Sequence, residues 1–128
     1  MFETNFKKNA PTKNERGVFL TQCFEQSNLS QPALVKQVHR EYLEVGAQVL
    51  TTNTFGANRV KLGRYGLEGE VRSFNLEGAR LAREVAGERA YVGGSVGPTG
   101  FSLSELSKGS LHEVRRALSE QLSALVEG

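Results

Sequence analysis

The sequence has no tryptophan, one cysteine, one methionine and three prolines among its 128 residues. Because Cys23 is alone, the chain cannot form an internal disulfide and does not belong to the disulfide-stapled secreted class. No apolar run approaches the ~20 residues that a membrane-spanning helix requires. Residues 1–16 are polar and lack the apolar core of a secretory signal. We therefore expect a cytoplasmic protein with no membrane partner.

An excess of one charge is also missing. The 16 basic and 14 acidic residues are well mixed and leave a formal net charge of +2. No basic stripe is interleaved with aromatic residues, which disfavours nucleic acid as a partner. The 38% hydrophobic and 23% charged residues are ordinary for a globular protein. One domain with a sizeable core is expected.

Helical spacing predicts the first regular element after residue 28. Asn28 or Ser30 is expected to cap a helix with Pro32 in its first turn, and Gly46 is expected to end it. Its predicted apolar face consists of Leu34, Val35, Val38, Tyr42 and Val45. A strand over residues 48–53, a short helix over 57–64 and a longer helix over 68–86 follow, and Gly87 stops the longer helix.

A second strand is predicted over residues 90–95, followed by a glycine-rich turn and a last helix capped by Ser110. The apolar residues of that helix recur every three or four positions, at Leu111, Val114, Leu118, Leu122 and Val126. Helices alternating with strands indicate an α/β fold with parallel strands. Parallel strands are stable when both faces are covered, so two strands alone predict an incomplete sheet.

Six short runs lie in order between Arg16 and Gly100: Arg16-Gly17-Val18-Phe19-Leu20, Cys23-Phe24-Glu25, Asn28-Leu29-Ser30-Gln31-Pro32, His39-Arg40-Glu41-Tyr42-Leu43-Glu44, Thr52-Asn53-Thr54-Phe55-Gly56-Ala57-Asn58 and Gly94-Ser95-Val96-Gly97-Pro98. These runs resemble the motifs of one known family, the homocysteine S-methyltransferases, and above all the type that is fused to a methylenetetrahydrofolate reductase. The resemblance implies that residues 17–128 are the amino-terminal part of a (β/α)8 TIM barrel, a fold that needs about 250 residues.

The family transfers a methyl group to homocysteine, whose thiolate is activated by a zinc ion held by three cysteines. The resemblance places those cysteines beyond Gly128, and Cys23 matches none of them. We therefore expect no metal ligand and no catalytic residue in this chain. The methyl donor is left open, and a folate is one donor that the resemblance allows.

The amino-terminal residues depart from the family's pattern. Its first strand begins Asp-Gly-Ala-Met-Gly-Thr, where this chain has Phe6-Lys7-Lys8-Asn9-Ala10-Pro11. Proline is poorly suited to a central strand. Residues 1–16 are therefore interpreted as an irregular lead-in that replaces the first strand.

Polar residues at the two predicted strand exits are the candidate site. The resemblance implies that Thr52, Asn53 and Thr54 contact homocysteine, together with Ser95 and Gly97. Alternatively, Asn53 and Thr54 satisfy turn amides and cap the next helix at Ala57, and the glycines only form the barrel rim. His39 and His112 are expected on helix surfaces.

Three hypotheses about function follow from the sequence. The first is that the chain is a truncated piece of a homocysteine S-methyltransferase, without independent activity, that works with the missing carboxy-terminal half of the barrel. The second is a non-catalytic interaction protein that associates with itself or a partner through exposed strand edges. The third is a small-ligand-binding remnant of the barrel.

Overall fold

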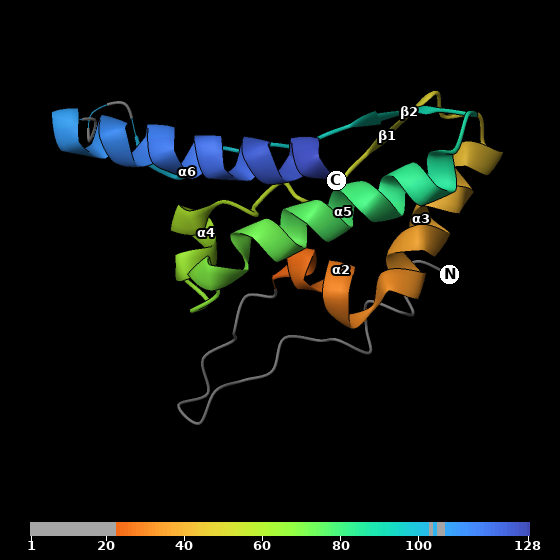
Figure 1. The fold of residues 1–128 in the computed structure, drawn as a ribbon, viewed down its shortest axis with the longest axis horizontal. Coiled ribbons are helices and arrows are strands. Elements are labelled where there is room, and N and C mark those ends of the chain that lie inside the picture. The colour runs from red at the N-terminus through yellow and green to blue at the C-terminus, as the bar shows by residue number, and fades with distance from the viewer. Residues whose placement is uncertain (1–22, 103, 105–106) are drawn as a thin grey trace.

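A computed structural model describes residues 23–102, 104 and 107–128 of the chain, in which helices pack on one face of a parallel sheet (Figure 1). Its elements are η1 (Phe24–Gln26), α2 (Ser27–Ser30), α3 (Pro32–Glu44), β1 (Val49–Thr51), α4 (Arg59–Gly63), η2 (Glu68–Glu70), α5 (Val71–Ala86), β2 (Tyr91–Gly93) and α6 (Lys108–Glu127). This order confirms the predicted α/β alternation. The predicted lead-in at residues 1–16 lies outside the described residues.

Strands β1 and β2 pair in parallel, and they form a two-stranded sheet within the described chain. Leu50 lies opposite Val92, and its side chain is buried toward the helices. Val49 lies opposite Tyr91, and these side chains are 52% and 80% exposed. Because successive side chains of a strand alternate between faces, one face of the sheet is covered by helices and the other is open.

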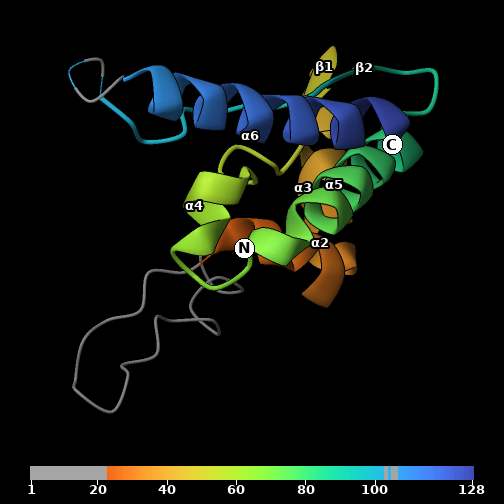
Figure 2. The ribbon, with the colours of Figure 1, turned by 60° about the vertical axis from the view of Figure 1, so that its left-hand side comes forward.

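Helix α5 is the centre of the packing. It lies between α3 and α6, and α6 lies across α4 and α5 (Figure 2). Phe74 and Val71 join Cys23, Ala57 and Leu62 in one core cluster. A second cluster under the sheet contains Leu43, Leu50 and Ala86. As predicted, α5 ends at Gly87, which has a positive φ of 50°.

The predicted helix caps are partly wrong. Pro32 does begin α3, but its N-cap residue is Gln31, because Asn28 and Ser30 belong to the separate short helix α2. Asn58, rather than Asn53 or Thr54, caps α4 by accepting a hydrogen bond from the Lys61 amide. Helix α6 begins one turn earlier than expected.

Ser107 is the N-cap residue of α6, and Ser110 is the third residue of a reciprocal capping box with it. The prediction that Ser110 caps the helix was therefore wrong by one turn. Within the described residues, no helix is long and apolar enough to cross a membrane.

The predicted apolar faces of α3 and α6 meet the described core only in part. Helix α3 buries Val35, His39 and Leu43, while Tyr42 and Val45 are exposed. The expectation that His39 lies on the surface was therefore wrong, whereas His112 is exposed as expected. Helix α6 packs through Ala117, Gln121 and Ala124, and most of its predicted apolar residues face outward.

Candidate functional site

The two strand exits are joined by a closed ring of hydrogen bonds. The Ser95 amide donates to Thr52 Oγ1 at 2.9 Å, and Thr54 Oγ1 donates to the Ser95 carbonyl oxygen at 2.8 Å. Thr52 Oγ1 and Thr54 Oγ1 lie 2.6 Å apart. Because the single hydroxyl hydrogen of Thr54 is used on Ser95, the Thr52 hydroxyl must donate to Thr54. Both threonine side chains are buried. The ring fixes the exit of β1 against the exit of β2.

The Asn53 side chain lies between the strand exit and the segment before α3. Its Nδ2 donates to the Phe24 carbonyl oxygen at 3.0 Å and to Asn28 Oδ1 at 3.1 Å. The buried Asn28 returns a bond from Nδ2 to the Asn53 carbonyl oxygen at 2.8 Å and also bonds the Phe74 carbonyl oxygen. These amide pairs hold the β1 exit on both α2 and α5.

Gly97 allows the two exit loops to approach each other closely. Its amide donates to the Phe55 carbonyl oxygen at 2.9 Å. A Cβ atom at position 97 would lie 2.6 Å from that oxygen, so no side chain fits there without a shift of the backbone. On the other side of the loop, the Gly56 amide donates to Glu25 Oε1 at 2.6 Å.

Helix α6 reaches the same site through a buried amide. Gln121 Nε2 donates to the Thr54 carbonyl oxygen at 2.8 Å and to Asn75 Oδ1 at 3.1 Å. Asn75 in turn bonds the Ala57 carbonyl oxygen at 2.8 Å. The exit of β1 is thus held by helices α5 and α6 as well as by β2.

Some polar atoms at the exits are not used in this network. Ser95 and Asn53 are half-buried, and Ser95 Oγ and Asn53 Oδ1 make no hydrogen bond with any described residue. Thr51 and Asn53 line a groove of about 800 Å³ between α3 and β1, together with the exposed ring of Phe55. The groove combines apolar walls with a few polar groups at one end, as small-molecule sites do.

Two titratable residues near the groove are buried. Burial, with a smaller effect of neighbouring Glu25, raises the pKa of the Cys23 thiol to about 11, so it carries no thiolate at neutral pH. Burial lowers the pKa of His39, whose Nε2 has no hydrogen-bond partner among the described residues. The described part of the chain contains no group of three histidine, cysteine or acidic residues that could hold a metal ion.

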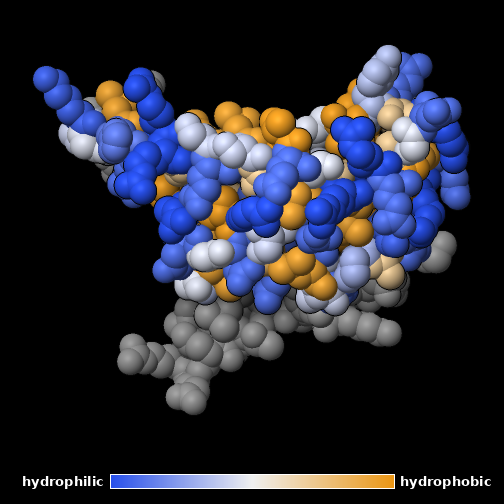
Figure 3. All heavy atoms as spheres, viewed as in Figure 1, coloured by the Kyte–Doolittle hydropathy of each residue, from blue (hydrophilic) through white to orange (hydrophobic). Residues whose placement is uncertain are grey.

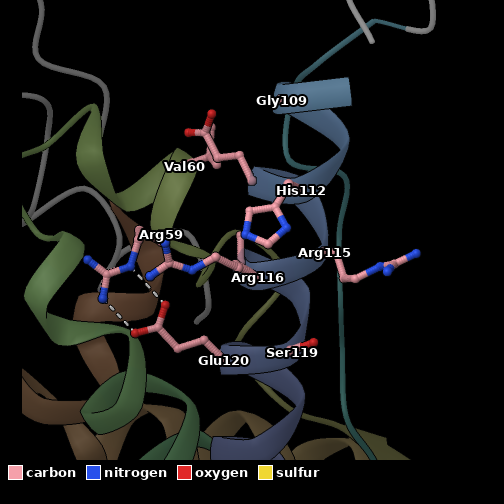
Figure 4. A pocket seen from close by; sticks show the side chains of 10 residues that line it. Arg59, Val60, Gly109, His112, Arg115, Arg116, Ser119 and Glu120 are labelled. Atoms are coloured by element: carbon pink, nitrogen blue, oxygen red, sulfur yellow. Dashed lines mark hydrogen bonds and ion pairs between the residues drawn. The ribbon is translucent and has the colours of Figure 1, made fainter. Parts of the chain in front are cut away.

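A further pocket lies on the outer side of the molecule, between α4 and α6. Arg59 Nε and Nη2 donate to the two oxygens of Glu120 at 2.9 and 2.7 Å, and Arg116 lies beside this pair (Figure 4). Hydrogen bonding to Glu120 raises the pKa of Arg59 further above its usual value. The pocket contains none of the residues predicted at the strand exits.

Known proteins resemble the chain both in sequence and in fold. The sequence profile of the homocysteine S-methyltransferase family matches residues 2–128. The chain belongs to this family. It is 36% identical over 112 residues to a methionine synthase of Mycobacterium leprae and 35% identical to that of Mycobacterium tuberculosis. In both cases the match covers 83% of this chain and 9% of the relative.

Solved structures support the family's fold. The homocysteine methyltransferase MmuM of Escherichia coli superposes on the chain with a TM-score of 0.64 in its oxidized form and 0.65 in its metallated form. The sequence identities are 24% and 23%. The superposition covers 95–97% of this chain but only 47–48% of that protein. The chain therefore spans about half the length of this solved relative.

The structure brings all five predicted site residues together, and most of them make the contacts between the two strand exits. The Thr52 and Thr54 hydroxyls join the two exits, and Gly97 provides the close approach. Sequence reasoning assigned no site role to Glu25 or Asn28, although both lie in family-like motifs. Each of them contacts a residue of the β1 exit that is more than twenty positions away in the sequence, so local spacing could not reveal these contacts.

Proposed function

We propose that this chain forms the first βα units of a homocysteine-binding (β/α)8 barrel and takes part in methyl transfer to homocysteine once the rest of the barrel is present. The observation that carries the proposal is the hydrogen-bonded ring of Thr52, Thr54 and Ser95. It holds the carboxyl ends of two parallel strands together, which is where barrel enzymes of this fold bind substrates.

The uncovered surfaces support the need for further protein. The face of the sheet that carries Val49 and Tyr91 is open, and a parallel sheet is stable when both of its faces are covered. The solved relative contains about as much chain again beyond the part that superposes. An isolated chain with these faces open is expected to be inactive.

The chemistry of an amino acid fits the unused polar atoms. Homocysteine carries an ammonium group, which only donates hydrogen bonds, and a carboxylate, which only accepts them. We assign Asn53 Oδ1 to the ammonium group and the Ser95 hydroxyl to the carboxylate. Thr52 and Thr54 are positioning residues in this proposal because their hydroxyls are already used within the ring.

The described residues do not fit a zinc site. Cys23 is the only cysteine of the chain, its pKa is raised to about 11, and among the described residues no third ligating side chain joins it and the neighbouring Glu25. A zinc ligand is a thiolate, which this burial disfavours. Activation of the homocysteine thiol is therefore assigned to protein outside the described residues, and the methyl donor, a folate or another, is assigned there too.

A chimeric enzyme tests the substrate contacts. Residues 23–128 would replace the matching segment of the Mycobacterium tuberculosis methionine synthase, and homocysteine binding would be measured by calorimetry. Loss of one hydrogen bond to a charged group costs about 1.5–3 kcal/mol, so Ser95→Ala should weaken binding by about tenfold or more. The matched control is Ser123→Ala, which removes an exposed hydroxyl on α6. Equal affinity of the two variants would refute the assignment of Ser95.

The second candidate function is a non-catalytic interaction protein. The open sheet face with Val49 and Tyr91 favours it, because exposed apolar faces and free strand edges promote association. Sedimentation of the full chain separates the candidates. A stable dimer that Val49→Lys converts to monomer would favour self-association, whereas a chain that is monomeric at all concentrations contradicts it. Calorimetry of the unfused chain with homocysteine tests the third possibility, a small-ligand-binding remnant.

A further inference from the structure

Glu25 is the one residue with a formal charge at neutral pH among the described residues that line the groove between α3 and β1. His39 also lines the groove, but burial lowers its pKa and keeps it neutral. In the view of Figure 3, hydrophilic side chains cover much of the helices, so a single carboxylate there would have little effect. The groove differs because its walls are mostly apolar, as at Val38 and Leu50. Glu25 therefore sets a negative electrostatic potential inside it.

The Glu25 carboxylate is held in place but has no cation beside it. Its Oε1 accepts a hydrogen bond from the Gly56 amide at 2.6 Å, and its Oε2 accepts one from the Cys23 thiol at 3.5 Å. A carboxylate accepts about four hydrogen bonds, so both oxygens have room for a further donor. Glu25 is half-buried, and none of the ion pairs among the described residues includes it. Because a buried charge is unfavourable without a partner, the groove favours a positively charged ligand group.

A second acceptor lies at the same end of the groove. Asn53 lines the groove too, and its Nδ2 donates to the carbonyl oxygen of Phe24, the residue before Glu25. Nδ2 also donates to Asn28 Oδ1, so both amide hydrogens are used and the free polar atom of Asn53 is its Oδ1. Glu25 and Asn53 thus offer acceptors only. A primary ammonium group has three donors and a positive charge, which match these acceptors.

We propose that Glu25 is the counter-ion of the substrate's ammonium group and makes the strand exits selective for an amino acid over the same thiol without its amino group. This inference rests on the proposed function. Asn53 Oδ1 supplies a neutral acceptor for the ammonium group, whereas Glu25 supplies the charge. A charge-assisted hydrogen bond is about twice as strong as a neutral one, so Glu25 contributes more to the selectivity than Asn53 does.

Two ligands of the chimeric methionine synthase test the proposal. They are homocysteine and 4-sulfanylbutanoate, which is homocysteine without its amino group, and calorimetry gives the affinity of each. Glu25→Gln keeps the size of the side chain and an oxygen for the Gly56 amide, but removes the charge. Because a hydrogen bond to a charged group is lost, this variant should bind homocysteine about tenfold or more weakly and the analogue within about twofold of the unmodified chimera. Amide spectra of the full chain would check that Glu25→Gln changes only the surroundings of Gly56.

Glu113→Gln is the matched control, because Glu113 is exposed on α6 and does not line the groove. It should change neither affinity. Equal losses for both ligands in Glu25→Gln would show that Glu25 only holds the loop at Gly56, and would overturn the proposal. An unchanged homocysteine affinity in Glu25→Gln, together with weaker binding in Ser95→Ala, would overturn this inference and leave the proposed function standing. An unmodified chimera that binds neither ligand would contradict the proposed function, and this inference with it.

Discussion

Gln121 and the Thr54 carbonyl oxygen lie 67 positions apart in sequence and are joined by a buried hydrogen bond of 2.8 Å. The bond ties the last helix to the exit of the first described strand. Thr54 in turn holds Ser95 through its hydroxyl. The geometry of the candidate site therefore depends on how α6 is packed, and not only on the two strands.

Replacing the buried amide should destabilise the protein. Gln121→Leu keeps a similar volume but leaves Asn75 Oδ1 without its donor, whereas the Thr54 carbonyl oxygen keeps the bond from the Ala57 amide. An unsatisfied buried acceptor costs about 1–3 kcal/mol, and urea unfolding of the full chain would measure the loss. Ser123→Ala, at an exposed position of the same helix, is the control. A loss below about 0.5 kcal/mol would show that the bond contributes little.

Replacing Gly97 or Gly63 by alanine should have opposite effects on stability, because Gly97 lies against another loop and Gly63 lies in a helix with open space beside it. Gly97→Ala places a Cβ atom 2.6 Å from the Phe55 carbonyl oxygen, so the exit loops must move apart, at a cost of about 1–3 kcal/mol. Gly63→Ala meets no atom within 4 Å in helix α4 and should be neutral or stabilise by about 0.5–1 kcal/mol. Thermal unfolding of both variants measures the contrast. Equal melting temperatures would contradict the packing described for Gly97.

His39 should make the protein sensitive to mild acid. Burial lowers its pKa below 6.5, so the unfolded chain binds a proton at a higher pH than the folded chain does. The stability that the neutral form contributes is present above pH 6.5 and is lost as the pH falls through the folded pKa. Urea midpoints at pH 7.5 and 5.5 should differ less in His39→Leu than in the unmodified chain.

His112 provides the matched control for that experiment. It is exposed on α6, so His112→Gln should leave the dependence on pH as it is in the unmodified chain. If His39→Leu and His112→Gln show the same difference between the two pH values, burial of His39 is not the cause of the acid sensitivity.

Cys23 should react slowly with alkylating agents. Its thiol is buried in the cluster around Phe74, and its pKa is raised to about 11, while the thiolate is the reactive form. In a chain that also carries Ser123→Cys, iodoacetamide at pH 8 should modify position 123 at least tenfold faster than position 23, as peptide mass spectrometry would show. Urea should abolish the difference. Comparable rates without urea would mean that Cys23 is accessible.

The order of elements could be predicted from the sequence because its signals are local. Helical spacing, Pro32 at a helix start and Gly87 at a helix end each act within a few residues. The convergence of Thr52–Thr54 with Ser95 and Gly97 was also predictable, because the carboxyl ends of parallel strands meet at one edge. The hydroxyl ring was not, since it depends on the register between β1 and β2.

The packing of the outer helices could not be predicted in the same way. The spacing of apolar residues identifies the apolar side of a helix, but it does not say which part of that side packs against the rest of the protein. Helix α6 packs on α5 through small residues and the polar Gln121, which a search for large apolar side chains overlooks. Of the apolar residues that such a search finds, Val114 and Leu118 are only half-buried, and the others are exposed: Leu111, Leu122 and Val126.

The most direct test of the account is methyl transfer to homocysteine by the chimeric methionine synthase that carries residues 23–128, compared with the chain alone. The account predicts methionine formation by the chimera, with a reduced rate in Ser95→Ala, and none by the chain alone. A folded chimera that binds its metal but forms no methionine would contradict the proposal that these strand exits serve homocysteine. Methionine formation by the chain alone would contradict its dependence on the rest of the barrel.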